Sequence, residues 1–173
     1  DVTTLLVTGG SLGARRLNET IEASRLSLKN AGIQVLHIMG DRSELPEVSQ
    51  PDYVRIRYCD RMDLALVASD FAVCRAGAAT VSELCAIGLP AVYVPYPVGN
   101  GEQRFNVADV VDAGGGLLCL DADFTPQYVN HNLIPLVSDA RARNLVAQAA
   151  KAVGVSDGST RLLQLIHSVL GRD

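Results

Sequence analysis

Residues 71–83 read FAVCRAGAATVSE, in which four apolar residues are followed by a turn of small residues and then by a helical pattern. Residues 5–15, LLVTGGSLGAR, show the same order of strand, small-residue turn and helix start. A strand that leads through a tight turn into a helix is the unit of an open α/β sheet, where ligands bind at the carboxyl ends of strands. The two segments therefore predict the fold and direct attention to the loops after residues 8 and 74.

Six short apolar runs predict the strands. They cover residues 5–8, 34–39, 54–58, 71–74, 91–94 and 117–120. Nearly every position in them is apolar and segments of helix length separate them, which is typical of a parallel sheet covered on both faces. Because crossovers between parallel strands are right-handed, we expect an α/β fold with a Rossmann-like, doubly wound parallel sheet of about six strands.

Helical patterns occupy most of the intervening segments. Helices are expected over residues 14–30, 80–87, 102–113, 126–137, 139–153 and 159–170, with Asp139 and Ser159 as N-caps. Residues 41–52, which include Pro46 and Pro51, are expected to form a loop. No repeat or internal boundary is visible, so residues 1–173 are expected to form a single domain.

The composition argues against several classes of protein. The net charge is −4, the pI is near 5.3 and the basic residues are scattered, so nucleic acid is not expected as a partner. No apolar run approaches the roughly 20 residues of a membrane-spanning helix. Cys59, Cys74 and Cys119 lie in apolar runs and no CxxC pair occurs, which favours the reducing cytoplasm. The chain opens on an apolar run without an initiator Met, so we expect a piece of a longer protein.

The loop after the first predicted strand contains Gly9, Gly10, Ser11 and Gly13. Glycine lets the backbone approach a ligand closely, and the free N–H groups of the next helix start favour a phosphate. The alternative is a tight turn needed only for packing. The loop is no Walker A motif, and Thr8 replaces the first glycine of a dinucleotide-binding fingerprint. An NAD-binding Rossmann domain with Asp41 on the ribose therefore remains a minor alternative.

Two further loops carry side chains that suit a nucleotide sugar. Glu83 follows the loop after residue 74, and its carboxylate can accept hydrogen bonds from both ribose hydroxyls; helix capping is the alternative. Gln103 and Asn106 are spaced i, i+3, so their amides share one helix face and suit sugar hydroxyls; a solvated helix start is the alternative. Two anion-suited helix starts in one domain favour a diphosphate or nucleotide ligand.

Four ordered motifs carry a resemblance that covers nearly the whole chain. They are GGSLGAR (9–15), YCDRM (58–62), CRAGAATVSELCAIGLP (74–90) and GNGEQRFNVADVV (99–111). Together they resemble the donor half of the MurG family, the UDP-N-acetylglucosamine transferases of peptidoglycan synthesis, and GNGEQR resembles actinobacterial members. The resemblance implies the C-terminal half of a GT-B glycosyltransferase. In that architecture this half holds UDP-GlcNAc, and a missing N-terminal half holds the lipid-linked MurNAc-pentapeptide acceptor.

The resemblance also implies roles for single residues. These are phosphate contact for Gly10, Ser11 and Gly13, main-chain recognition of uracil for Cys59, a helix start facing the diphosphate for Ala79 and Thr80, ribose binding for Glu83, and GlcNAc binding for Gln103 and Asn106. Glu102 departs from the Gln or His of many relatives, so no sugar contact is carried over to it.

The resemblance implies an inverting transfer in which an acceptor hydroxyl displaces UDP and the helix starts stabilise the leaving diphosphate. No cofactor is implied, and the general base is expected in the missing half, so the isolated chain should bind the donor without useful turnover. The full-length enzyme is expected in the cytoplasm, at the cytoplasmic face of the cell membrane, and only it would contact the membrane. A partner-dependent subunit of a two-component N-acetylglucosaminyltransferase is the alternative.

Other polar features are expected to be structural. Asp121 and Asp123 form a DxD, which we interpret as a solvated, cap-forming turn before Thr125 rather than a metal site. His37 lies inside an apolar run and is expected to be a hydrogen-bonded core histidine.

Residues 156–173 carry an apolar helical face. Core packing is the first interpretation of this face, and docking onto the missing half or a membrane is the alternative.

Overall fold

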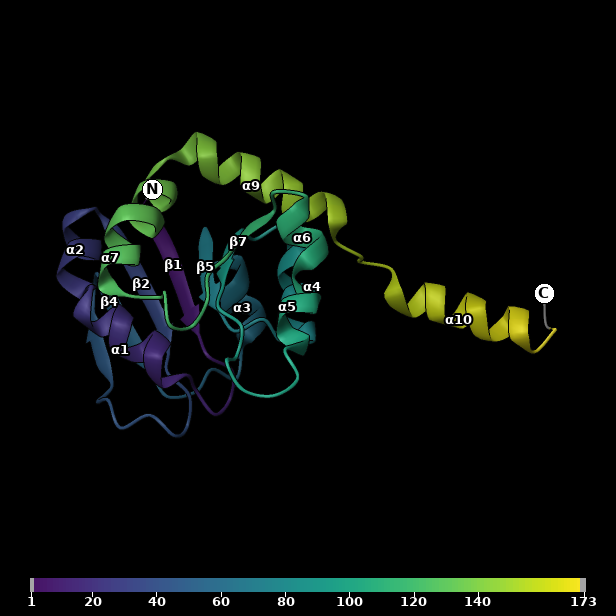
Figure 1. Ribbon diagram of the computed structural model, residues 1–173, viewed down its shortest axis with the longest axis horizontal. Helices are drawn as coiled ribbons and strands as arrows, with labels where there is room; N and C mark the ends of the chain where they lie inside the picture. The colour runs from purple at the N-terminus through teal and green to yellow at the C-terminus, as the bar shows by residue number, and fades with distance from the viewer. Residues whose placement is uncertain (1, 172–173) are drawn as a thin grey trace.

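Seven strands form one sheet in the computed structural model, which describes residues 2–171. The strands are β1 (Thr3–Thr8), β2 (Ile33–Ile38), β3 (Val48–Gln50), β4 (Tyr53–Ile56), β5 (Phe71–Cys74), β6 (Ala91–Tyr93) and β7 (Gly116–Leu118). Their spatial order is β3-β4-β2-β1-β5-β6-β7, and every neighbouring pair is parallel except β3 with β4. All six expected strands are present, which confirms the doubly wound α/β fold (Figure 1).

Strand β3 lies within residues 41–52, for which the sequence predicts a loop, so that prediction is wrong in part. Val48 pairs with Arg55 in an antiparallel ladder. The strand is three residues long, falls between Pro46 and Pro51, and pairs on one side only. Prolines are compatible with such an edge position, whereas in a central strand they would remove ladder hydrogen bonds.

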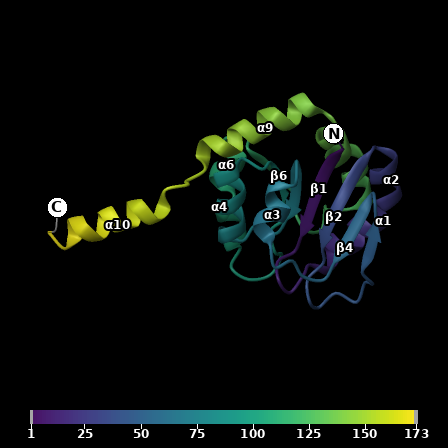
Figure 2. The ribbon, with the colours of Figure 1, turned by 180° about the vertical axis from the view of Figure 1, so that it is seen from behind.

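Helices cover both faces of the sheet, because successive strand residues point to opposite faces and both sets are apolar. The face that carries Leu5 packs against α1 (Arg15–Ala23), α2 (Arg25–Asn30), α7 (Pro126–Tyr128), η1 (Val129–Leu133) and α8 (Ile134–Ser138). The face that carries Leu6 packs against α3 (Met62–Val67), α4 (Ala78–Ile87), α6 (Ala108–Asp112) and α9 (Ala140–Val153). The two helical layers are visible in Figures 1 and 2.

Two of the expected helices are interrupted for reasons that lie in single side chains. The helix expected over 14–30 is divided into α1 and α2 at Ser24, whose hydroxyl and backbone N–H both donate to the carbonyl of Thr20, at 2.8 and 3.0 Å, an arrangement that bends helices. The helix expected over 126–137 contains the π segment η1 directly before Pro135 and its neighbour. Proline has no N–H to donate to the preceding turn, so the ladder widens there.

A third expected helix, 102–113, is divided at Val107 into α5 (Glu102–Asn106) and α6. The six-residue helix α3 lies in a stretch for which the sequence analysis predicts no element. Asp139 caps α9 as expected, since its side chain accepts two backbone N–H groups of the first turn at 2.9 and 3.1 Å. These differences change helix boundaries but leave the order of layers as predicted.

The last helix, α10 (Gly158–Val169), projects away from the rest of the fold (Figures 1 and 2). None of its residues is buried, and Leu162 is 58% exposed, so the core-packing interpretation is wrong for the described residues. Ser159 is not the cap, because the helix begins before it. Residues 172 and 173 lie outside the described part of the chain. Within residues 2–171, no helix is both long and apolar enough to cross a membrane.

The strand order reverses beside β1. The chain passes from β1 to β2 and β4 on one side and then returns to β5 on the other. The loops that follow β1 and β5 therefore diverge and leave a crevice at the carboxyl edge of the sheet, where open α/β folds bind ligands.

Candidate functional site

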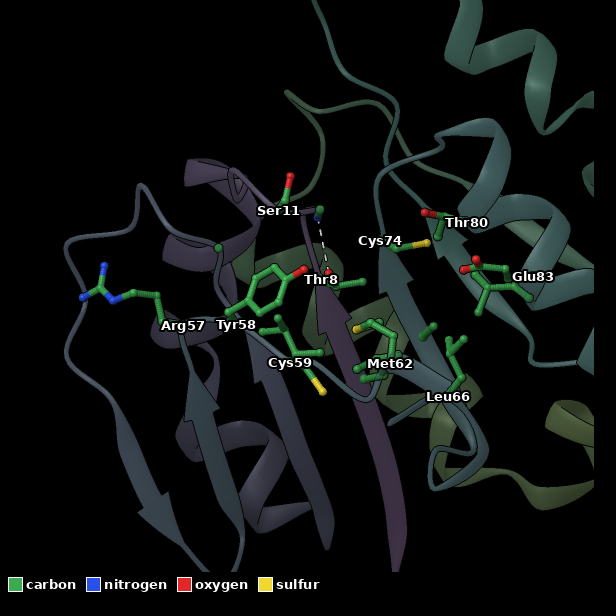
Figure 3. Close-up of a pocket in the computed structure, with 16 residues that line it drawn as sticks. Thr8, Ser11, Arg57, Tyr58, Cys59, Met62, Leu66, Cys74, Thr80 and Glu83 are labelled. Carbon is green, nitrogen blue, oxygen red and sulfur yellow. Dashed lines mark hydrogen bonds between the residues drawn. The ribbon is translucent and has the colours of Figure 1, made fainter. Parts of the chain in front are cut away.

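Two clefts open at the carboxyl ends of β1 and β5. The first, here named the apolar cleft, is lined by residues that include Ile38, Cys59, Met62, Leu66, Cys74, Thr80 and Glu83 (Figure 3). The second, here named the polar cleft, is lined by the glycine loop (residues 9–13) and by residues that include Arg15, Arg16, Arg75, Tyr96, Gln103 and Asp121. Gly10 and Ser11 line both, so the two clefts adjoin at the glycine loop.

The glycine loop forms a tight turn before α1. The backbone N–H of Gly13 donates to the carbonyl of Gly10 at 2.9 Å, and φ is +83° at Gly10 and +82° at Gly13. A Cβ on Gly13 would lie 2.2 Å from the carbonyl oxygen of Met39, so glycine is needed there for packing. A Cβ on Gly10 would meet no atom within 4 Å, and Ser11 beside it is exposed. The loop therefore combines one packing glycine with an open rim.

The helices that follow β1 and β5 both lack a side-chain cap. α1 follows Ala14 and α4 follows Gly77, and neither N-cap residue accepts a side-chain hydrogen bond from the first turn. The first-turn N–H groups thus have no helical partner and carry the positive end of the helix dipole, an arrangement that binds phosphate. Thr80 in the first turn of α4 lines the apolar cleft, whereas Ala79 is exposed and lines neither cleft.

Glu83 is the sixth residue of α4, beyond its first turn. The capping alternative is therefore wrong, because the effect of the helix dipole falls off within the first turn. In Figure 3 the side chains of Glu83 and Thr80 lie on one side of the apolar cleft, opposite Tyr58 and Cys59. A carboxylate in this position can accept hydrogen bonds from two neighbouring hydroxyls of a ligand.

The rest of the apolar cleft comes partly from elements that the sequence analysis missed. Helix α3 supplies Met62 and Leu66, whose i, i+4 spacing was the available signal of a helix. Cys59 lies in the loop after β4 rather than in a strand and is half-buried. Burial raises the pKa of the Cys74 thiol to about 12, so this thiol stays protonated. The part of the wall formed by Met62, Leu66 and Cys74 is therefore uncharged and suits a planar, neutral ring.

Gln103 and Asn106 join helix α5 to the loops after β5 and β6 at the edge of the polar cleft. The Gln103 Oε1 atom accepts the backbone N–H groups of Ala76 at 3.1 Å and Tyr96 at 2.9 Å. The Asn106 Nδ2 atom donates to the carbonyl of Ala76 at 2.9 Å. Each amide is thus anchored by one atom, which leaves Gln103 Nε2 as a donor and Asn106 Oδ1 as an acceptor. Gln103 lines the polar cleft, whereas Asn106 lines neither cleft.

Asp121 does not lie in a solvated turn, so this interpretation of the DxD is wrong for its first residue. Its side chain is 14% exposed and lies between two arginines, 2.6 Å from Arg75 Nη1 and 3.1 Å from Arg16 Nε. Asp123 is exposed, and Thr125 caps α7 as expected. Within the described residues, no group of three or more His, Cys, Asp or Glu could hold a metal ion.

Beneath the glycine loop, buried polar side chains form a hydrogen-bonded chain. His37 Nδ1 lies 2.8 Å from the hydroxyl of Tyr53, and His37 Nε2 lies 2.9 Å from Asn18 Oδ1. Asn18 Nδ2 donates to the carbonyl of Met39 at 2.9 Å, so Nε2 carries the proton of the neutral imidazole. Burial, together with the charge of Arg55, lowers the pKa of His37 to about 3. The expected hydrogen-bonded core histidine is confirmed.

A family model described as the glycosyltransferase family 28 C-terminal domain matches residues 4–162, which include both clefts. The chain belongs to this family. Membership in family 28 agrees with the resemblance that the four sequence motifs carry. The position of Asp41 argues against the alternative of an NAD-binding domain. Such a domain would use Asp41 to bind the ribose, but Asp41 lines neither cleft.

Two relatives extend the family 28 assignment. A protein of Leifsonia xyli subsp. xyli is 57% identical over 170 residues, covering 98% of this chain and 48% of its own length. A protein of Streptomyces coelicolor is 50% identical over 171 residues, covering 96% of this chain and 47% of its own length. Both are named UDP-N-acetylglucosamine--N-acetylmuramyl-(pentapeptide) pyrophosphoryl-undecaprenol N-acetylglucosamine transferase. The chain spans about half the length of the curated relatives it matches.

Solved structures share this fold. The crystal structure of Acinetobacter baumannii MurG superposes with a TM-score of 0.83 at 24% identity, covering 97% of this chain and 50% of that one. CalG4, the calicheamicin glycosyltransferase, gives a TM-score of 0.73 at 19% identity, covering 99% of this chain and 44% of that one. At these identities the likeness concerns the fold alone, and it confirms the expected half of a GT-B glycosyltransferase.

Proposed function

We propose that this chain is the donor-binding half of an inverting N-acetylglucosaminyltransferase and that it binds UDP-GlcNAc. In the longer protein, GlcNAc is transferred to the lipid-linked MurNAc-pentapeptide precursor of peptidoglycan. The names of the Leifsonia and Streptomyces relatives support this donor and this acceptor. The acceptor is assigned to the part of those relatives that this chain does not match.

One observation carries the proposal. Two helix starts without side-chain caps, at α1 and α4, flank the same crevice as the carboxylate of Glu83. Free N–H groups at helix starts favour a phosphate or diphosphate, and a carboxylate favours a vicinal diol. A nucleoside diphosphate carries both groups at the spacing of one ribose, so it suits this crevice better than a ligand with only one of them.

The diphosphate contacts the glycine loop through Gly10, Ser11 and Gly13 and the start of α4 through Ala79 and Thr80. Ala79 is exposed and lines neither cleft, so its part is limited to its backbone N–H. The Ser11 hydroxyl, exposed at the junction of the clefts, adds one hydrogen bond.

The nucleoside lies in the apolar cleft. Uracil contacts the main chain at Cys59, and the ribose hydroxyls donate to Glu83, which stands on the opposite wall (Figure 3). The sugar lies in the polar cleft, where the free Nε2 of Gln103 donates to one GlcNAc hydroxyl. Asn106 Oδ1 accepts from another hydroxyl once the loops close around the donor.

The same arrangement serves the chemistry. In an inverting transfer, the acceptor hydroxyl attacks the anomeric carbon while the bond to the diphosphate breaks, and UDP leaves with increased negative charge. Donors that are already oriented toward the diphosphate stabilise that charge as it develops. The general base belongs to the acceptor half, so the isolated chain binds the donor and does not turn it over.

The exposed helix α10 and the site of action belong to the same proposal. Residues 1–173 act as one donor domain, and the apolar face within residues 156–173, which includes Leu162 and Ile166, docks onto the acceptor half. The complete enzyme works in the cytoplasm at the inner face of the cell membrane. Membrane contact is made by the complete enzyme and not by this domain alone.

Calorimetric titration of the purified chain with UDP, UDP-GlcNAc and NAD tests the proposal. Saturable binding of both uridine nucleotides, with NAD at least about tenfold weaker, is the expected result. Preference for NAD would contradict the proposal and support a dinucleotide-binding domain. Detectable GlcNAc transfer to a lipid-linked acceptor by the pure chain would contradict the assignment of the base to the other half. A separate membrane-bound acceptor subunit that completes the activity would favour the two-component arrangement instead.

A further inference from the structure

Three charged side chains from distant parts of the sequence meet at the polar cleft. Arg16 stands in the first turn of α1, Arg75 follows β5 and Asp121 follows β7. One carboxylate oxygen of Asp121 lies 2.6 Å from Arg75 Nη1, and the other lies 3.1 Å from Arg16 Nε. All three residues line the polar cleft, so a single carboxylate links the loop after β7 to the start of α1 and to the loop after β5.

Arg75 is held by one end of its guanidinium group. Its Nη1 atom donates to the carbonyls of Val94 and Pro95, both at 3.1 Å, while it faces Asp121. In the part of the chain that the structure describes, no hydrogen bond involves the Nε or Nη2 atoms of Arg75. The side chain is only 13% exposed and stacks over the ring of Tyr96 at 5.7 Å. A nearly buried guanidinium with unused donors in a cleft is suited to an anion.

We propose that Asp121 is a positioning residue that holds Arg75, and with it Arg16, so that the unused donors of Arg75 meet the diphosphate of a nucleotide sugar. The proposal rests on the proposed function and adds a residue that it does not include. Two arginines and one aspartate leave a net charge of +1, which attracts a diphosphate. Without the carboxylate, the two nearby cations repel each other, and Arg75 keeps its two hydrogen bonds to carbonyls and its contact with Tyr96 but loses its ion pair.

A purely electrostatic role for Asp121 makes the opposite prediction. Replacing the carboxylate by a neutral amide makes the cleft more positive by one charge, which alone would tighten the binding of a diphosphate. A positioning role predicts weaker binding, because an amide cannot hold two guanidinium groups by charge. Asp121→Glu separates the two roles again, since it keeps the charge and moves it by one methylene group.

The test is a titration, monitored by NMR, with UDP and with uridine. It compares four chains: wild type, Asp121→Asn, Asp121→Glu and Asp123→Asn. In both Asp121 variants the Kd for UDP should rise about tenfold, while the Kd for uridine stays within about twofold. Asp123→Asn, an exposed member of the same DxD, should behave as wild type with both ligands. A general loss of structure would weaken uridine and UDP alike, so the ratio of the two constants reports positioning.

The outcomes separate this inference from the function on which it rests. If the wild-type chain binds UDP and Asp121→Asn binds it equally well or more tightly, the positioning role is overturned. Unchanged UDP affinity in Asp121→Glu would overturn it too. Both results leave the donor assignment standing. An equal loss of uridine and UDP binding would overturn it as well, because the role would then be structural. Absence of UDP binding by the wild-type chain would contradict the proposed function itself and the inference with it.

Discussion

The two clefts share Gly10 and Ser11 but are built by different means. The apolar cleft is walled by the sheet and by helices packed on it, and residues such as Cys74 and Leu84 belong equally to the cleft and to the core. The polar cleft is held together by side chains that join loops, such as Gln103. Packing of the core therefore fixes the shape of the first, and a few polar contacts fix the second. Single substitutions should affect them differently.

The largest effect is expected in the glycine loop, which borders both clefts and depends on a close backbone approach. Gly13→Ala should lower the free energy of unfolding by about 3 kcal/mol or more, because the new Cβ would meet the Met39 carbonyl oxygen at 2.2 Å in a backbone with φ of +82°. Gly10→Ala is the matched control, since its φ is +83° but nothing lies within 4 Å, and it should lose only about 1–2 kcal/mol. Urea unfolding measures the stability of both variants. Equal losses of stability would mean that the close approach of Gly13 to Met39 does not require glycine.

A second effect should appear on acidification, as a loss of stability at the buried, hydrogen-bonded side chains of Tyr53, His37 and Asn18 beneath the glycine loop. His37 has a folded pKa of about 3, below its usual value of 6.5, so protonation favours the unfolded chain. The contribution of neutral His37 to the free energy of unfolding is complete above pH 6.5 and declines toward pH 3. Between pH 6.5 and 5 the loss is about 2 kcal/mol. Urea unfolding across this range should give a shallower pH slope for His37→Gln. Identical slopes would mean that the histidine does not titrate as its burial demands.

A smaller, ligand-specific effect should sharpen the contrast between the clefts. Gln103→Ala should weaken UDP-GlcNAc about tenfold and UDP less than about threefold, because the lost Nε2 donor faces the sugar and not the nucleoside. Arg104→Ala, an exposed residue of the same helix that lines neither cleft, is the control. Calorimetry gives both constants. Equal weakening of UDP-GlcNAc and UDP binding would mean that Gln103 only holds the loops in place and does not contact the sugar.

The smallest effect is expected from removing α10. Deletion of residues 156–173 should change the free energy of unfolding by less than about 0.5 kcal/mol and leave UDP binding unaltered, since no residue of α10 is buried. Truncation after residue 139 is the contrasting control, because it also removes α9 and its fully buried Ala150. A large loss of thermal stability on removing α10 alone would show that the helix packs on this domain.

The sequence predicts most of the fold and the edge of the sheet that carries the site, because both depend on local patterns. Apolar runs and glycine turns announce β1 and β5 and the loops after them. The edge strand β3 is missed because three residues between two prolines carry no periodicity. Helix α3 is missed because six residues give less than two turns of pattern. The break at Ser24 depends on one hydroxyl, which composition does not reveal.

The candidate site is predictable only in part. The glycine loop follows β1 directly, and Thr80 and Glu83 lie on the helix that follows β5, so their position at one crevice is predictable from the topology. Asp121 meets a partner 105 residues away in sequence, and such a pairing requires the three-dimensional fold. The anchoring of Gln103 to two backbone N–H groups is equally long-range in origin, since it depends on how two loops meet.

The central claim is that this chain binds a uridine nucleotide with Glu83 on the ribose. Calorimetric titration of UDP into the wild-type chain, Glu83→Ala and the exposed neighbour Ser82→Ala tests it most directly. We expect saturable binding by the wild-type and Ser82→Ala chains, a Kd raised at least about tenfold in Glu83→Ala, and unchanged stability of all three. Equal UDP affinity in the wild-type and Glu83→Ala chains would contradict the account.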